Sequence, residues 1–166
     1  MVNTGPIAFY IPSLTVGGAE RVTVSVANGL ADRGYEVDLV VSFNDGAFRE
    51  EVAEEVTVVD LGTRKIPVLG IGASVPCLSR YLSVRSPAIM FSQMTYANDI
   101  YLVSQLIARS DTVSIGTIHN TLGMQEEPKE KFVQSLQRRL AAQADQFVAV
   151  SEGVADSVVE NVGVDR

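Results

Sequence analysis

The chain has 166 residues, 46% hydrophobic and 20% charged, which describes one globular domain and excludes a disordered or low-complexity polymer. Acidic residues outnumber basic ones by 20 to 13, so the net charge of −7 disfavours nucleic acid as a partner. One cysteine, Cys77, allows no internal disulfide, and one histidine, His119, allows no histidine-rich metal site. We therefore expect no bound metal and no cofactor.

The N-terminal segment lacks a basic region followed by a long apolar run, so it does not resemble a secretory signal. No stretch approaches the roughly 20 apolar residues that span a bilayer. We expect a cytoplasmic protein, with contact to the inner face of the membrane as an open alternative.

Strand-like and helix-like segments alternate from the start of the chain. Short apolar runs typical of buried parallel strands lie at 7–11, 37–41, 56–61, 88–91, 112–118 and 147–150. Helical spacing of apolar residues is found at 19–33, 98–109, 128–144 and 152–161, and a short helix or turn precedes the third strand. This alternation predicts an α/β fold, a Rossmann-like doubly wound parallel sheet of about six or seven strands with helices on both faces.

Two of these helices carry an apolar stripe that we expect to face the sheet. In the first helix the stripe consists of Ala19, Val22, Val26 and Leu30, with Gly34 as the stop. In the helix over 98–109 it consists of Ile100, Val103, Leu106 and Ile107. Ser151 is the expected N-cap of the last helix. Prolines and glycines make residues 62–87 the least clear part, although 77–84 could form two helical turns.

The sequence contains no internal repeat and no linker that would divide residues 1–166 into two domains. Ligands of doubly wound sheets bind outside the carboxyl ends of the strands, near the point where the strand order reverses. This rule selects four segments as the candidate site: 12–20, 92–98, 118–126 and 151–153.

Gly17 and Gly18 join the first strand to the first helix. Two glycines leave backbone N–H groups uncovered, and the helix N-terminus adds partial positive charge, so this turn could bind a phosphate or diphosphate. The alternative is a plain tight turn. The dinucleotide fingerprint GxGxxG is absent, and no acidic residue closes the second strand, so an oxidoreductase is disfavoured.

Polar side chains follow the fourth and fifth strands. His119, at the end of the fifth strand, could hydrogen-bond a sugar hydroxyl or stabilise developing charge, and a structural role is its alternative. Gln93, Tyr96 and Asn98 suit recognition of a hydroxylated ligand, or form an ordinary polar loop. The charges at 126–139 indicate a solvated helix face that could also meet an anionic acceptor or a membrane surface.

Three segments, taken together and in this order, resemble the N-terminal half of the GT4-type retaining glycosyltransferases of the GT-B fold. They are IAFYIPSLTVGGAERVTVSVANGLADRGYEVDLVV at 7–41, TVSIGTIHNT at 112–121 and FVAVSEGVADSVVENVGVDR at 147–166. In that family two Rossmann-like domains face each other, and the N-terminal domain mainly holds the acceptor. The resemblance implies that residues 1–166 are a single acceptor-side domain, one half of a GT-B fold, and that the donor-binding C-terminal domain with its paired glutamates is missing.

The resemblance also implies roles for individual residues. Gly17 and Gly18 match the glycine-rich loop that approaches the donor diphosphate, and His119 matches the strand-end histidine beside the transferred sugar. Gln93, Tyr96 and Asn98 would line the acceptor side. The implied reaction moves a hexosyl group from a nucleotide sugar to a sugar or lipid-linked hydroxyl acceptor, with retention and without a metal. The fragment alone is expected to be inactive.

Two functions of other classes stay open at this point. One is a stand-alone, non-catalytic binding module for a phosphorylated or glycosylated ligand, and the other is an assembly subunit that docks a partner chain. Self-association of the isolated domain is a further expectation, because a missing partner domain leaves apolar surface exposed. The sequence names neither the sugar, the nucleotide nor the acceptor.

Overall fold

The computed structural model describes residues 4–15, 17–63, 73–119 and 139–162. The strands are β1 (Ile7–Ile11), β2 (Val37–Val41), β3 (Thr57–Asp60), β4 (Ile89–Gln93), β5 (Val113–Ile118) and β6 (Gln146–Ala149). The helices are α1 (Gly18–Ala31), the 3₁₀ helix η1 (Ala47–Glu51), α2 (Ser74–Arg85), α3 (Thr95–Ala108) and α5 (Glu152–Val162). Residues 128–138 of the helix predicted over 128–144 lie outside the described residues.

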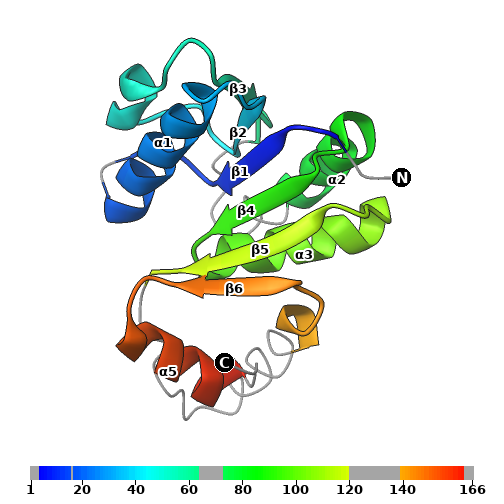
Figure 1. Cartoon of the computed structure of the whole chain (residues 1–166). Helices are drawn as coiled ribbons and strands as arrows, with labels where there is room; N and C mark the ends of the chain where they lie inside the picture. The colour runs from blue at the N-terminus through cyan, green and yellow to red at the C-terminus, as the bar shows by residue number, and fades with distance from the viewer. Residues whose placement is uncertain (1–3, 16, 64–72, 120–138, 163–166) are drawn as a thin grey trace.

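The six strands form one sheet in the order β3-β2-β1-β4-β5-β6 (Figure 1). Every neighbouring pair is parallel, from β3 at one edge to β6 at the other. The order reverses between β1 and β4, which makes this the topological switch point of a doubly wound sheet. The predicted Rossmann-like fold class is therefore confirmed.

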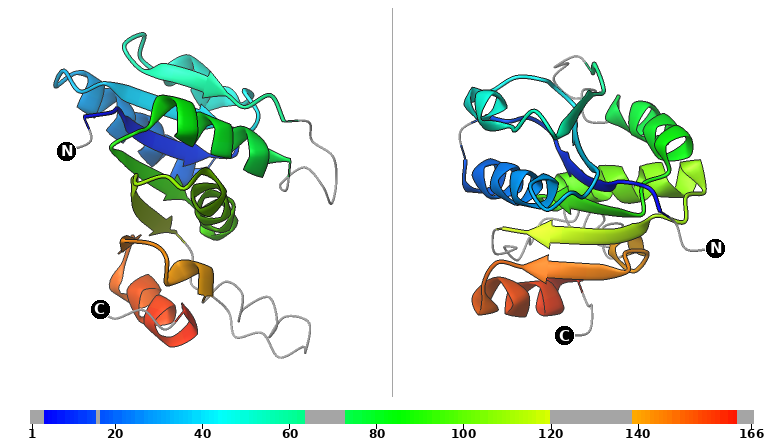
Figure 2. Two further views of the ribbon diagram at one scale, coloured as in Figure 1. Left: turned by 90° about the vertical axis from the view of Figure 1, so that its right-hand side faces the viewer. Right: turned by 45° about the horizontal axis from the view of Figure 1, so that its top comes forward.

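Helices cover both faces of the sheet (Figures 1 and 2). On one face α1 and η1 pack against the strands through a core that includes Phe9, Ile11, Leu39 and Val41. On the other face α2 and α3 pack through a core that includes Tyr10, Leu78, Met90 and Tyr101. A third, smaller cluster joins α5 to Ile118 at the β6 end of the sheet. No helix within the described ranges combines the length and apolar content needed to cross a membrane.

The side of α1 that faces the sheet differs from the prediction. Val22 is 54% exposed and Val26 is also exposed. The buried residues of α1 are Ala19, Glu20, Thr23, Val24, Ala27 and Ala31. Thr23 can be buried because its hydroxyl donates a hydrogen bond to the carbonyl of Ala19 at 2.7 Å. Gly34 follows the helix at a φ of +84°, as expected of a helix stop.

The prediction for α3 was also partly wrong. Ile100 is buried as expected, whereas Leu106 and Ile107 are exposed. The buried residues of α3 are Ala97, Asn98, Ile100, Tyr101, Leu102 and Ser104. The buried hydroxyl of Ser104 donates to the carbonyl of Ile100 at 2.7 Å.

At the start of α5 the predicted cap is confirmed, because the N–H of Val154 donates to Oγ of Ser151 at 3.3 Å.

An ionic network around the buried carboxylate of Asp38 joins α2 to β2. Asp38 has no exposed surface, and its Oδ2 accepts hydrogen bonds from the hydroxyl of Tyr81 at 2.7 Å and from Nε of Arg85 at 2.8 Å. Arg85 also pairs with Glu36, at 2.5 Å between Nη2 and Oε1. Burial, together with the hydrogen bond to Asp38, raises the pKa of Tyr81 well above its usual value, so the phenol stays a proton donor.

This network gives a test of stability. Arg85→Ala removes a cation from the buried carboxylate of Asp38. We expect it to lower the free energy of unfolding by about 2 kcal/mol, less than for a fully buried pair because Arg85 is partly exposed. Arg80→Ala, on the exposed side of the same helix, is the control and should change stability by less than about 0.5 kcal/mol. Urea unfolding followed by circular dichroism measures both. Equal stabilities would contradict the role of the network.

Candidate functional site

The candidate site lies where the carboxyl ends of β1, β4 and β5 reach the same edge of the sheet, as the arrowheads in Figure 1 show. Gly17 and Gly18 follow β1, Gln93 ends β4, and His119 follows β5. Tyr96 and Asn98 belong to the start of α3, directly after β4. The topology thus brings all six predicted site residues to one edge, whereas residues 120–126 of the candidate segments lie outside the described residues.

The loop that leads from β1 to Gly17 is held by the segment after β2. Leu14 is fully buried, its N–H donates to the carbonyl of Asp45 at 2.9 Å, and its carbonyl accepts from the N–H of Phe48 at 3.1 Å. Gly46 has a φ of +119°, and a side chain there would overlap the backbone of Leu14. The loop therefore has a fixed path at Leu14, while Val16 lies outside the described residues.

The two glycines of this loop have different surroundings. Gly17 is the N-cap of α1 in an extended conformation with a φ of −176°, which any residue can adopt. A Cβ on Gly17 would overlap the carboxylate of Glu20, which would have to move aside. A Cβ on Gly18 would meet no atom within 4 Å. Gly18 is exposed, so its backbone is the part of the loop that a ligand can approach.

Glu20 is a site residue that the sequence analysis did not single out. It is only 9% exposed, although it lies in the first turn of α1. Its Oε1 accepts a hydrogen bond from the hydroxyl of Thr15 at 3.4 Å. The signal was present in the sequence, since a glutamate three positions after an N-cap typically folds back over the start of its helix.

His119 is held by a side chain of the neighbouring strand. Its Nε2 lies 2.9 Å from Oε1 of Gln93, and the ring is half-buried. Because Oε1 can only accept, this contact assigns the proton to Nε2 and leaves Nδ1 as a hydrogen-bond acceptor. Burial lowers the pKa of His119 below its usual 6.5, while the charge of Glu20 acts in the opposite direction. A neutral imidazole at pH 7 follows.

The turn between β4 and α3 has a strained backbone. Met94 adopts a φ of +79° with a ψ of 148°, a region that residues other than glycine rarely occupy. Its N–H donates to the carbonyl of Thr117 at 3.2 Å, and its carbonyl accepts from the N–H of Asn98 at 3.0 Å. These bonds hold the strained residue directly beside Gln93, which partners His119.

The three residues predicted to line the acceptor side lie at different depths. Gln93 and Asn98 are both buried, and the amide of Asn98 is hydrogen-bonded to the hydroxyl of Ser92 at 2.7 Å. Tyr96 is 41% exposed and presents its ring at the edge. Burial and the charge of Glu20 raise the pKa of the Tyr96 phenol. Contact of these residues with an acceptor stays a prediction.

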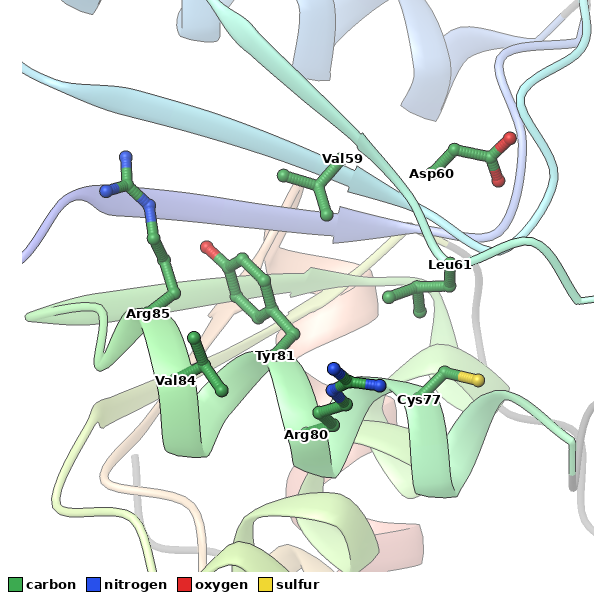
Figure 3. Close-up of a pocket in the computed structure, with 8 residues that line it drawn as sticks. All are labelled: Val59, Asp60, Leu61, Cys77, Arg80, Tyr81, Val84 and Arg85. Atoms are coloured by element: carbon green, nitrogen blue, oxygen red, sulfur yellow. The ribbon is translucent and has the colours of Figure 1, made fainter.

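A groove of about 470 Å³ lies away from these residues, between β3 and α2 (Figure 3). It is lined by Val59, Asp60, Leu61, Cys77, Arg80, Tyr81, Val84 and Arg85. The figure places Arg85 and Tyr81 at one end and Cys77 at the other. Arg85 and Tyr81 already bind Asp38, so the polar groups at that end serve the packing of α2 on the sheet.

The lowered pKa of His119 predicts a pH dependence of stability. Between the folded pKa and about 6.5, the unfolded chain binds a proton that the folded chain does not, so the free energy of unfolding should rise with pH across this window. His119 is the only histidine, so His119→Gln should flatten the rise. Urea unfolding at a series of pH values from 5.5 to about 7.5 measures it. An unchanged slope in the variant would contradict the assignment.

Comparison with known proteins places this chain in a family. The sequence model of Glycosyltransferase Family 4 matches residues 16–166. Alpha-1,3/1,6-mannosyltransferase ALG2 of Candida glabrata is 32% identical over an alignment 110 residues long, which covers 60% of this chain and 22% of that protein. The chain thus spans about a fifth of the length of this relative.

Two solved structures show the same fold. Sucrose-phosphate synthase from Thermosynechococcus elongatus superposes with a TM-score of 0.69 at 12% identity, over 94% of this chain and 44% of its own. Anabaena Alr3699/HepE, solved in complex with UDP and glucose, has a TM-score of 0.65 at 20% identity, over 95% of this chain and 41% of its own. The fold and the family match over most of the sequence agree, and the chain belongs to Glycosyltransferase Family 4.

Proposed function

We propose that this chain is the acceptor-side, N-terminal domain of a retaining glycosyltransferase that moves a hexosyl group from a nucleotide sugar to a hydroxyl acceptor. The observation that carries the proposal is the family match, together with the Gly17–Gly18 loop and the His119–Gln93 pair at one edge of the sheet. The UDP and glucose in the HepE structure, and the mannosyltransferase activity in the name of ALG2, support a nucleoside-diphosphate hexose as the donor class.

A second domain would complete the donor pocket. The chain covers only 44% of the sucrose-phosphate synthase chain and 41% of the HepE chain, which supports a partner domain of similar size. In this proposal residues 1–166 alone have no transferase activity. Contact with a membrane surface and self-association of the isolated domain stay predictions.

In the proposed reaction the Gly17–Gly18 loop and His119 contact different parts of the donor. The exposed backbone at Gly18 and the positive end of α1 would face the donor diphosphate. Nδ1 of His119, left as an acceptor by the bond to Gln93, would accept a hydrogen bond from a hydroxyl of the transferred sugar. Both contacts act through fixed groups, so little reorganisation is needed as charge develops on the diphosphate.

Retention follows from attack on the face from which the diphosphate leaves. The acceptor oxygen forms its bond to the anomeric carbon as the bond from that carbon to the diphosphate oxygen breaks. A diphosphate oxygen takes the acceptor proton, and a nucleoside diphosphate is released. The proposal needs no metal or other cofactor. Tyr96, as the exposed member of its group, would contact the acceptor, while Gln93 and Asn98 would hold the edge from behind.

The role of His119 can be tested in the full-length enzyme. His119→Ala should lower turnover at least about a hundredfold with a panel of UDP- and GDP-linked hexoses, because it removes a fixed group beside the reacting sugar. The thermal midpoint of unfolding checks that the variant is folded. Wild-type turnover in the variant would assign His119 a structural role only.

The proposed retention has a separate test. NMR of the product of the wild-type enzyme determines its anomeric configuration, and an inverted product would contradict retention.

The role of the glycine loop has a test of its own. Gly18→Val should weaken binding of UDP or GDP to the full-length enzyme while leaving the fold intact, because a Cβ at this position meets no atom within 4 Å outside its own stretch of backbone and fills space beside the loop. Gly29→Val is the matched control, since Gly29 lies near the other end of the same helix, where an added Cβ meets only the flexible end of the Arg33 side chain. Calorimetry measures both affinities. If the two variants bind equally well, the loop does not hold the diphosphate.

A further inference from the structure

The proposed function leaves one buried charge of the site without a role. Glu20 is 9% exposed, and the hydroxyl of Thr15 donates to its Oε1 at 3.4 Å. Its Oε2 lies against Gly17, at the position that a side chain on Gly17 would take. The carboxylate is therefore seated on the same loop that the proposal gives to the donor diphosphate.

The charge of Glu20 acts on two groups of other elements. His119 follows β5 and Tyr96 lies in α3: this charge adds to the burial that raises the pKa of Tyr96, and it opposes the burial that lowers the pKa of His119. Gln93, which faces the ring of His119 from β4, carries no charge.

A carboxylate and a phosphate compete for the same surroundings. Both are stabilised by the N–H groups and the positive end of a helix N-terminus, and each disfavours the other through like charge. The repulsion is strong in a site that water reaches poorly, because screening there is weak. An anion can occupy the Gly17 side of the loop only after the carboxylate of Glu20 has moved.

Resting on the proposed function, we propose that Glu20 is a positioning residue whose carboxylate occupies the Gly17 side of the loop until the anion that binds the loop displaces it. The side chain is long enough to leave Gly17 without movement of the helix, since Oε2 is at the far end of a flexible chain. Glu20 then sets how much negative charge a ligand must bring, which favours a diphosphate over a singly charged anion.

The test uses two variants of the 166-residue chain that each remove one negative charge. Glu20→Gln keeps the shape of the side chain and removes the competitor, and Glu50→Gln, at an exposed position in η1, is the matched control. Inorganic pyrophosphate is the probe, titrated by calorimetry at pH 8 and low salt. We expect Glu20→Gln to bind it about threefold or more tightly than the wild type, the size expected for one charge at a helix N-terminus, and Glu50→Gln to match the wild type.

A second measurement follows His119 by NMR, where the only histidine of the chain gives one titration curve. The midpoint should move to lower pH in Glu20→Gln, stay unchanged in Glu50→Gln, and stay near the wild type in Glu20→Asp, which keeps the charge. Pyrophosphate binding by Glu20→Gln that is no tighter than that of the control would overturn the proposal, as would an unmoved midpoint. Neither readout uses sugar transfer, so failure of the proposed reaction would be seen separately.

Discussion

The parallel pairing of β1 with β4 is the constraint on which the rest of the site depends. It brings Phe9 opposite Phe91, and the two rings stack with their centroids 5.1 Å apart on the face that α1 covers. The chain continues from β1 into α1 on this face and from β4 into α3 on the other face. The two connections therefore diverge beyond the carboxyl ends of the strands. The groups on the edge between them come from segments far apart in the sequence.

The polar groups on this edge are fixed before any ligand is considered. Gln93 holds the ring of His119, and Ser92 holds the amide of Asn98. The first bond joins the end of β4 to the end of the neighbouring strand β5, and the second joins β4 to α3. A side chain therefore cannot rotate without losing a partner that burial makes costly to lose. The strained backbone of Met94 persists because its N–H and carbonyl are both engaged. Such fixed geometry is what the sugar-binding role proposed for this edge would need.

The strands could be predicted from sequence because strands buried on both faces must be almost continuously apolar. The side of each helix that faces the sheet could not be predicted, because the rule that polar residues face water failed at particular positions. Thr23 and Ser104 lie buried, since each hydroxyl is satisfied by a carbonyl one turn earlier in its own helix. Val22 and Val26 lie exposed instead, because the small side chains of α1 let it approach the sheet along another face.

The edge rule also predicted where the candidate site lies, but not how its charges are arranged. Glycine at 17 and 18 appears in the sequence as one phosphate-binding turn. In the fold the two positions separate: the carboxylate of Glu20 lies where a Cβ on Gly17 would point, while Gly18 borders open space. A pattern of residues indicates that a loop could accept an anion, yet only tertiary contacts show that the chain already places a carboxylate there. The loop proposed to bind the phosphate of a ligand thus already holds a carboxylate of its own chain.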